Sequence, residues 1–308
     1  MADLVVVTGA AGFIGRHVCR ALVAQGVRVR ALGHGMDAAG AESCGLSGWL
    51  DASVDFDALS RLLGTDIPEA VIHCAGSASV AYSYAQPYGD YERSVSTVAT
   101  VLEHLRVACG NQPRLVLTSS AGVYGDQGEV DLTETSACSP ISPYGFNKRA
   151  AEDLSTSYSR FFGAKISIVR LFSVYGEGLR KQLLWDAANK FAREDATFFG
   201  TGHELRDWIH VEDAAALLCA AALRPQARFE IFTGGNEQAS TGEVLSRFGA
   251  MLGSAASPTF TGETHSGNPR RLTTDCSHAR RELGWSPAIG LDDGLARYAS
   301  WFKSLAKA

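Results

Sequence analysis

A tyrosine and a lysine, Tyr144 and Lys148, have the types and the spacing needed for proton transfer in this chain of 308 residues. Residues at positions i and i+4 of a helix lie on one face, so the phenol and the ammonium can converge. A tyrosine hydroxyl ordinarily titrates at about 10, and a nearby ammonium favours the phenolate and lowers that pKa. We therefore expect Tyr144 to exchange a proton with a substrate hydroxyl at neutral pH, with Lys148 as its partner.

A segment rich in hydroxyl groups, residues 118–125, follows an apolar run and precedes this pair. Ser120 is the best candidate for a hydroxyl that bonds the reacting oxygen beside Tyr144, and the neighbouring Ser119 is the alternative. Tyr124 has two interpretations, a contact with the substrate or packing in the core. The segment thus predicts a third polar group for the catalytic pair.

Three glycines follow the first apolar run at regular spacing: Gly9, Gly12 and Gly15. Gly9 would form a tight turn, Gly12 would let the backbone approach a pyrophosphate, and Gly15 would allow close packing of a helix on the strand. The start of that helix has free N–H groups and a dipole that favour an anion. A strand before the glycines and an amphipathic helix after them are the context that dinucleotide binding requires. The spacing G-x-x-G-x-x-G resembles that of the short-chain dehydrogenase/reductase family.

The end of the second apolar run bears on the choice between NAD and NADP. Enzymes that use NAD usually carry an acidic residue there, which bonds the 2′-hydroxyl of the ribose, whereas this chain has Gly33 followed by His34. A carboxylate would repel the 2′-phosphate of NADP, and His34 stands about where NADP-preferring relatives carry arginine. Histidine is a weaker partner whose charge depends on pH. We therefore expect NADP(H), with NAD(H) as the alternative.

Short apolar runs alternate with amphipathic stretches through the first half of the chain. Several runs are almost wholly apolar, which is typical of strands buried on both faces of a parallel sheet. Alternation at this spacing predicts an α/β fold with a Rossmann-type doubly wound sheet. We expect strands over residues 4–8, 27–32, 70–75, 114–119 and 165–171, and helices over residues 14–25, 57–63, 88–108 and 144–162.

The pattern loosens after about residue 175, where a helix over 211–223 and a strand over 229–233 still fit the sheet. The sequence therefore predicts two interleaved domains. Residues 1–174 with 207–235 would form the dinucleotide-binding domain, and residues 175–206 with 236–308 a smaller substrate-binding domain. The substrate would lie in the cleft between the two.

Composition argues against several kinds of partner. Lysine plus arginine is 28 and aspartate plus glutamate is 33, which gives a net charge of −5. Without basic runs, neither nucleic acid nor an anionic membrane is expected.

No apolar run could span a bilayer, and the first strand begins too early to leave room for a secretory signal. The 7 scattered cysteines contain no C-x-x-C pair, which indicates reduced thiols in a cytoplasmic protein; we expect no metal.

Later segments extend the family resemblance over nearly the whole chain. They resemble the extended short-chain dehydrogenase/reductases that act on nucleotide sugars, the group of UDP-galactose 4-epimerase. The resemblance implies that Arg206 and an arginine of the pair Arg270 and Arg271 hold the substrate phosphates, a task that suits guanidinium groups. It also implies that Asp51 contacts the adenine and that the backbone at residues 73–76 passes close to the cofactor. The matching segments are residues 170–178, 199–213, 267–275 and 283–287.

Two small residues narrow the reaction that the resemblance implies. The 4,6-dehydratases carry Asp and Glu at the positions of Ala121 and Gly122, and UDP-glucuronate decarboxylases carry Glu at the position of Gly122. Without these carboxylates, neither dehydration nor decarboxylation is expected. The remaining reactions are redox reactions at C4 of the sugar. They are net reduction of a 4-keto sugar and epimerisation by oxidation and re-reduction.

Further departures favour reduction. UDP-galactose 4-epimerases usually have Asn at the positions of Ser94 and Ser173, Thr at Gly122 and an acidic residue at Gly33. An epimerase keeps its NAD tightly bound, whereas a reductase exchanges NADPH in every turnover, and the missing acid suits exchange better. We therefore expect an NADPH-dependent 4-keto reductase of a nucleoside-diphosphate sugar. A 4-epimerase is the alternative, and a dinucleotide-sensing regulatory protein is a remote one.

In the expected mechanism, Lys148 bonds the nicotinamide ribose, and Tyr144 protonates the developing alkoxide with help from Ser120. The presence of all three residues favours an enzyme over a sensor.

Family members commonly dimerise through two long helices, and residues 88–108 and 144–162 are suitable for this, so we expect a homodimer. The expected cofactor contacts are Gly9, Gly12, Phe13, Ile14, Gly15, Gly33, His34, Asp51, Ala52, Ala75, Gly76, Ser119, Tyr144, Lys148 and Leu171, and the expected substrate contacts are Ser79, Ser120, Tyr144, Ser173, Arg206 and Arg270.

Overall fold

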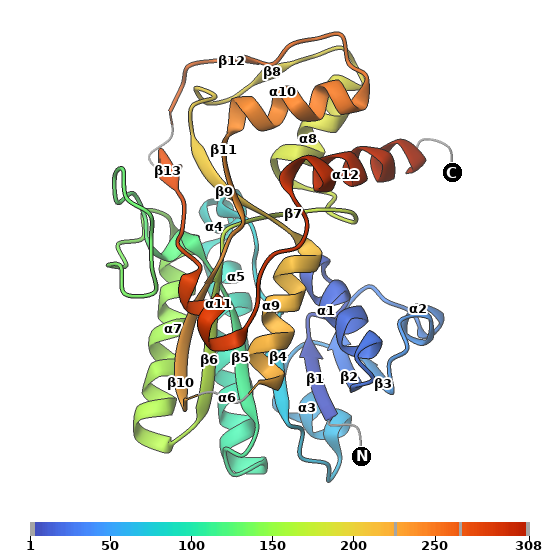
Figure 1. The fold of residues 1–308 in the computed structure, drawn as a ribbon. Helices are drawn as coiled ribbons and strands as arrows, with labels where there is room; N and C mark the ends of the chain where they lie inside the picture. Colours follow the sequence, from blue (N-terminus) through green and yellow to red (C-terminus); the bar gives the residue numbers. More distant parts are fainter. Residues whose placement is uncertain (1–3, 225–226, 265–266, 306–308) are drawn as a thin grey trace.

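A seven-stranded parallel sheet forms the centre of the computed structural model, which describes residues 4–224, 227–264 and 267–305 (Figure 1). Its strand order is β10-β6-β5-β4-β1-β2-β3, and each neighbouring pair is parallel. The order reverses between β1 and β4, the place where such sheets bind ligands at the carboxyl ends of their strands. The predicted doubly wound α/β fold is therefore confirmed. The strands are β1 (Leu4–Thr8), β2 (Arg28–Gly33), β3 (Gly48–Asp51), β4 (Ala70–His73), β5 (Arg114–Ser120), β6 (Lys165–Leu171) and β10 (Phe229–Gly234).

The central strands are buried on both faces, which explains why their sequences are continuous apolar runs. In β1, Val5 and Val7 belong to one core cluster, whereas Leu4 and Val6 belong to another. Successive strand residues point to opposite faces, so each cluster takes every second residue of the strand. The helices α1 (Phe13–Ala24) and α9 (Val211–Leu223) cover the first face, and α3 (Phe56–Leu63), α6 (Thr97–Ala108) and α7 (Pro143–Phe162) cover the second.

Helical structure runs without a gap over residues 88–108, the range predicted as one helix. The structure has α4 (Val80–Ala85), α5 (Pro87–Tyr91) and a π-helical turn over Glu92–Ser96 before α6 begins. The predicted helix is therefore confirmed, and the widened turn inside it is the feature that apolar periodicity does not register. Short π-helical turns are frequent at functional sites, and this one packs against α7.

Most of the remaining elements form a smaller assembly, which lies above the seven-stranded sheet in Figure 1. Its sheet is built around β9, which pairs with each of the other three strands. The helices pack around an apolar cluster of their own. The domain boundaries stay a prediction. No helix among the described residues is long and apolar enough to cross a membrane. The elements are β7 (Ser173–Tyr175), β9 (Leu205–His210), β11 (Glu237–Ser240), β13 (Arg271–Leu272), α8 (Gln182–Phe191), α10 (Thr241–Leu252) and α12 (Leu291–Leu305).

Candidate active site

The carboxyl end of β5 presents Ser120 to the first turn of α7. The Ser120 hydroxyl accepts a 3.1 Å hydrogen bond from the Gly122 N–H and so caps the short 3₁₀ turn Ala121–Val123. A Cβ built at Gly122 would lie 3.4 Å from the Ser120 hydroxyl oxygen and 3.3 Å from the Tyr144 ring, so the two side chains border the same space. Two of the three predicted catalytic groups therefore lie next to each other.

Local sequence places Tyr144 in the first turn of α7. The Ser142 hydroxyl caps the helix by accepting a 3.1 Å hydrogen bond from the Gly145 N–H. Pro143 suits the first helical position, where no N–H is required. A side chain at Gly145 would collide with the Gly122 carbonyl oxygen, so this glycine allows α7 to approach the turn that follows β5.

Lys148 lies one turn further along α7 and is buried. Its Nζ donates a 3.1 Å hydrogen bond to the Thr118 carbonyl oxygen and lies 5.9 Å from the centre of the Tyr144 ring. Burial lowers the pKa of Lys148, and the negative charge of Asp90 is the largest effect that opposes the lowering. Gly76 is so near that a Cβ built there would lie 3.5 Å from Nζ. The ammonium is therefore close to the loop at which the sequence predicts the cofactor.

The pKa of Tyr144 is raised, and the lowering predicted from the sequence is wrong. Burial is the main cause, because it disfavours the phenolate. The adjacent Ser120 hydroxyl acts in the opposite direction, and the charge of Asp90 adds to the rise. The Lys148 ammonium bonds the backbone instead of the phenol, so its attraction for the phenolate does not outweigh the effect of burial.

The glycine-rich loop after β1 has the shape that a dinucleotide requires. Gly9 has a φ of +68°, and a Cβ there would lie 2.5 Å from the Ala75 nitrogen. A Cβ at Gly15 would strike the Gly9 carbonyl oxygen, so the close approach of helix and loop depends on this glycine. Gly12 precedes α1 and brings no capping side chain, which leaves the first N–H groups of the helix to an anion. These residues fit the pyrophosphate of NAD or NADP.

His34 and Asp51, both predicted to contact the cofactor, bond each other. His34 Nδ1 lies 2.9 Å from Asp51 Oδ1, and Nε2 lies 3.1 Å from Ser53 Oγ. The two side chains meet because β2 and β3 are adjacent and place Gly33 opposite Asp51. The sequence treated His34 as a separate partner for a phosphate. In the structure the imidazole lies beside the Asp51 carboxylate, and the predicted phosphate contact of His34 stays a prediction.

A cavity of about 610 Å³ opens at this end of the sheet, where the adenosine part of the cofactor is expected. Two arginines of α1, Arg16 and Arg20, line it together with Asp37 and Asp51. Arg16 donates a 3.0 Å hydrogen bond to the Ala11 carbonyl oxygen. The sequence analysis missed both arginines, although their i, i+4 spacing just after Gly15 is a usable signal.

The guanidinium of Arg206 donates hydrogen bonds to other parts of the protein. This residue is 8% exposed, and its Nη2 donates to Asn268 Oδ1 at 2.6 Å and to the Pro269 carbonyl oxygen at 2.7 Å. Burial lowers the pKa of Arg206 to about 10. In this structure the guanidinium fastens the loop to β9, and the predicted phosphate contact stays a prediction. Arg270 is exposed on that loop and suits a phosphate better, whereas Arg271 is held in ion pairs.

The other predicted contacts lie in varied positions. Ser79 caps α4, its hydroxyl accepting from the Tyr82 N–H at 3.1 Å, and Ser173 begins β7 with partial exposure. Leu171, at the end of β6, is buried in the core, so its side chain is closed to a ligand. Phe13 packs against the apolar cluster of the smaller assembly. Sequence spacing gave the positions of these residues along the chain but not the direction of their side chains.

A buried polar network lies behind Ser120. The Ser119 hydroxyl donates a 2.6 Å hydrogen bond to Glu152 Oε1, so this alternative to Ser120 is engaged by the protein. Glu152 also accepts bonds of 3.0 and 2.8 Å from Arg170, and both side chains are only 2% exposed. Arg170 Nη1 donates to the Tyr124 hydroxyl at 3.1 Å. Tyr124 is fully buried, which supports packing over a substrate contact.

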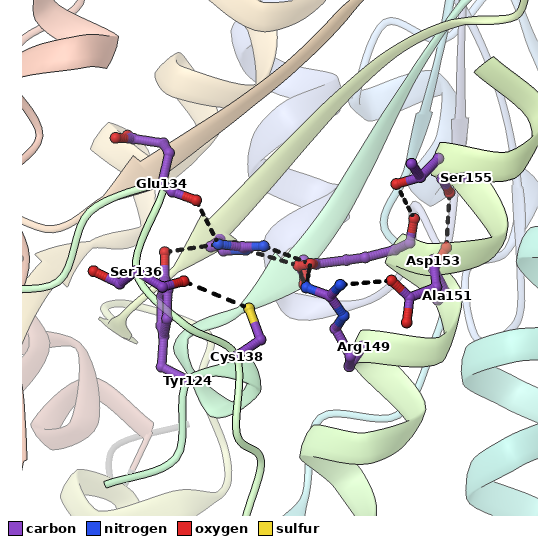
Figure 2. Close-up of polar contacts among 12 residues, drawn as sticks. Tyr124, Glu134, Ser136, Cys138, Arg149, Ala151, Asp153 and Ser155 are labelled. Carbon is purple, nitrogen blue, oxygen red and sulfur yellow. Dashed lines mark hydrogen bonds and ion pairs between the residues drawn. The ribbon is translucent and has the colours of Figure 1, made fainter. Parts of the chain in front are cut away.

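The network joins segments that are distant in the sequence. In Figure 2, Tyr124 and Glu134 lie on one side of it and Arg149 of α7 on the other. The Glu134 carbonyl oxygen accepts a 3.1 Å bond from Arg170. The sequence analysis missed Glu152 and Arg170, although an arginine inside an apolar strand indicates a buried partner. The network fixes the end of β5 and the middle of α7, and so positions Ser120 and Tyr144.

Comparison with known proteins agrees with this geometry. Residues 5–233 match the family described as "NAD dependent epimerase/dehydratase family". A UDP-glucuronate 4-epimerase from Thermodesulfobacterium geofontis is 28% identical over 96% of this chain and 95% of its own. A dTDP-glucose 4,6-dehydratase from Xanthomonas campestris pv. campestris is 27% identical over 96% of this chain and 92% of its own.

Solved structures resemble the whole fold. A UDP-glucose 4-epimerase from Thermotoga maritima, with UDP-glucose, has a TM-score of 0.88 and 25% identity, and the match covers 98% of this chain and 99% of that chain. A UDP-glucuronic acid 4-epimerase from Bacillus cereus, in complex with UDP-glucuronic acid and NAD, has a TM-score of 0.87 and 26% identity with the same coverage. This chain therefore belongs to the NAD dependent epimerase/dehydratase family, within the extended short-chain dehydrogenase/reductases that act on nucleotide sugars.

Proposed function

We propose that this enzyme interconverts the C4 epimers of a nucleoside-diphosphate sugar and uses NAD as a bound cofactor. The observation that carries the proposal is the position of Ser120 next to Tyr144 beside the buried Lys148. Relatives named as 4-epimerases align over nearly the whole chain. They support epimerisation better than the NADPH-dependent reduction that the sequence favoured.

The residues of the site divide the chemistry between them. NAD, when bound, would supply the hydride acceptor that oxidises C4 and then the donor that reduces it. Tyr144 takes the proton of the C4 hydroxyl during oxidation and returns it during reduction. Ser120 bonds the same oxygen and holds it near the phenol. The buried ammonium of Lys148 provides positive charge beside the phenolate while the proton is away.

Dehydration is a poor fit to the same site. Elimination of water needs an acid and a base besides the redox pair, and Ala121 and Gly122 provide neither. A Cβ at Gly122 would lie 3.3 Å from the Tyr144 ring, so the glycine keeps space open beside the phenol. The 27% identity to a 4,6-dehydratase therefore supports the fold and the redox step, but not the elimination.

The first experiment identifies the dinucleotide that the freshly purified protein releases on denaturation. Stoichiometric NAD, together with interconversion of UDP-sugar epimers without added cofactor, is the expected result. Tyr144→Phe should lower turnover by about 10²- to 10⁴-fold and leave the NAD content unchanged. An unchanged rate would contradict the catalytic assignment of Tyr144, whereas bound NAD without any turnover would favour a dinucleotide-sensing protein. Protein that releases no NAD and interconverts no epimers would contradict the proposed reaction.

A second candidate, an NADPH-dependent 4-keto reductase, is favoured by the adenosine end of the site. Gly33 provides no carboxylate against a 2′-phosphate, and Arg16 and Arg20 line the cavity beside it. A reductase would release NADP or nothing on denaturation and would consume NADPH with a 4-keto sugar. Binding of 2′,5′-ADP compared with 5′-AMP tests the phosphate contact directly. Arg16→Ala with Arg20→Ala should then weaken the first ligand and spare the second.

We also propose a homodimer formed through the outer faces of α6 and α7. Val107, Phe146, Phe161 and Phe162 are large apolar side chains that these helices expose to solvent. Exposed apolar groups gathered on neighbouring helices are typical of interfaces between subunits. Sedimentation analysis should give a mass of two chains, and Phe161→Glu should shift it toward one. A single-chain mass for the unaltered protein would contradict the dimer.

A further inference from the structure

A buried carboxylate beside the catalytic helix has a hydrogen-bond partner for only one of its two oxygens. Asp90 of α5 is 0% exposed, and its Oδ2 accepts a 2.7 Å hydrogen bond from Asn147 Nδ2. Its Oδ1 has no partner within the described residues, and neither has the hydroxyl of Ser94, which is 3% exposed in the π-helical turn. Buried polar atoms rarely lack partners, so each case calls for an explanation.

Geometry places the segment of Asp90 beside the Lys148 ammonium. Asn147, which bonds Asp90, directly precedes Lys148, and a Cβ built at Gly76 would lie 3.5 Å from Lys148 Nζ and 3.6 Å from the Arg93 carbonyl oxygen. The negative charge of Asp90 raises the pKa values of both Lys148 and Tyr144, against burial in the first case and with it in the second. From other elements, Cys74 and Glu152 also act on Lys148. Charges attract over longer distances in a buried, low-dielectric site, so a direct bond is not required.

The neighbouring ionic groups have partners of their own. Glu152 is neutralised by Arg170 at 2.8 Å. On the segment of Asp90 itself, Arg93 lies over the Tyr82 ring, 4.8 Å from its centre. Among the described residues, Asp90 is thus a buried carboxylate beside the catalytic helix that has no ion pair of its own.

We propose that Asp90 is a positioning residue of the active site, whose carboxylate balances the buried ammonium of Lys148 while Asn147 holds the carboxylate in place. The inference rests on the assignment of Tyr144 and Lys148 as the catalytic pair, and it applies to an epimerase and a reductase alike. Asp90 opposes ionisation of Tyr144 as well as loss of the proton from Lys148. Its removal therefore shifts both titrations in one direction, toward lower pH.

Asp90→Asn tests the charge with little change of shape, because the amide oxygen can still accept from Asn147. The pH profile of kcat/KM of the holoenzyme should move to lower pH by on the order of one unit. Asn147→Ala removes the hydrogen bond and keeps the charge, so its profile should move less. Asp153→Asn removes an exposed carboxylate of α7, paired with Arg149 at 2.7 Å, and should move nothing. An unmoved profile in Asp90→Asn would overturn the proposal.

A second measurement needs neither cofactor nor turnover. The tyrosinate signal of Tyr144 is obtained by ultraviolet difference titration against the Tyr144→Phe variant, with and without Asp90→Asn. The midpoint should be lower when Asp90 is neutral, and equal midpoints would refute the inference. A shifted midpoint in a protein that lacks activity at C4 would uphold the role of Asp90 and reject the proposed function, so the two failures are distinguishable.

A stability cycle decides the matter if Asp90→Asn alone folds poorly. Lys148→Met leaves Asp90 as an unbalanced buried charge and should lower the unfolding midpoint. Adding Asp90→Asn to that variant should raise the midpoint again, because the unbalanced charge disappears. A loss of the same size from Asp90→Asn in both backgrounds would show that Asp90 acts only in packing, and would overturn the proposal.

Discussion

Two buried carboxylates lie beside α7, and the protein satisfies them to different degrees. Both oxygens of Glu152 are bonded, Oε1 by Ser119 and Arg170 and Oε2 by Arg170. Asp90 is just as buried but accepts one bond, from Asn147. The first carboxylate belongs to a closed network, and the second has an oxygen without a partner among the described residues.

The difference separates a carboxylate that holds the backbone in place from one whose charge influences the catalytic pair. A fully bonded network has one low-energy arrangement, so it fixes the backbone at Ser120 and along α7. A carboxylate with one bonded oxygen is less well stabilised. It has no direct ion pair, so its negative charge acts on Lys148 and Tyr144 nearby. Both kinds of site are expected in one enzyme, because a rigid scaffold and an adjustable proton donor are separate requirements.

The largest effect is expected from breaking the closed network. Arg170→Met leaves Glu152 buried without its cation and should lower the free energy of unfolding by about 3–5 kcal/mol. Denaturant titration followed by circular dichroism measures the loss. The double variant Arg170→Met with Glu152→Leu removes both charges and should recover much of it. A double variant as unstable as the single one would show that the ion pair is not the cause.

These two carboxylates also mark what the sequence could not predict. The glycine spacing at Gly9–Gly15 and the pair Tyr144–Lys148 depend on residues close in the chain, and their positions were predicted. Glu152 and Arg170 are 18 residues apart, and Asp90 and Asn147 are 57 apart. Such pairs form only after the elements pack, and local periodicity does not encode them.

The sign of the Tyr144 pKa shift was missed for a related reason. The sequence shows that a lysine is near, but not that the phenol is buried or that Lys148 bonds the Thr118 carbonyl. The partners of Arg206 and His34 within the protein were missed for the same reason, because Asn268 and Asp51 reach them from other segments. Residue type and spacing locate a site, whereas burial and long-range partners set its electrostatics.

The buried imidazole of His73 tests whether a group that is hydrogen-bonded on both ring nitrogens can also accept a proton in the folded protein. His73 lies within hydrogen-bond distance of Thr8 at 2.8 Å and Thr97 at 3.3 Å. Burial, with the charge of Lys148, lowers the pKa of His73 to about 3. The unfolded chain therefore binds this proton at higher pH than the folded protein does. Stability should fall as the pH drops from about 6.5 toward 3, by up to about 1.4 kcal/mol per pH unit.

His73→Gln provides the comparison, because it keeps a polar side chain that does not titrate. Unfolding free energies measured at a series of acidic pH values should fall less steeply in this variant than in the unaltered protein. The difference between the two slopes isolates His73 from the carboxylates that titrate in the same range. Parallel slopes would mean that the imidazole accepts a proton in the folded state, and that hydrogen bonding alone protects a buried group here.

The smallest effect comes from two serines that match in burial but not in bonding. Ser119 is 4% exposed and bonds Glu152 at 2.6 Å, whereas Ser94 is 3% exposed and has no partner in the described structure. Ser119→Ala should cost about 1–3 kcal/mol, because it removes a bond from a buried charge. Ser94→Ala should stay within about 0.5 kcal/mol in thermal unfolding. Both changes delete the same atom from equally buried positions, so the difference between them measures the bond itself. Equal losses would mean that Ser94 is also bonded, and that incomplete pairing does not distinguish the Asp90 side of the site.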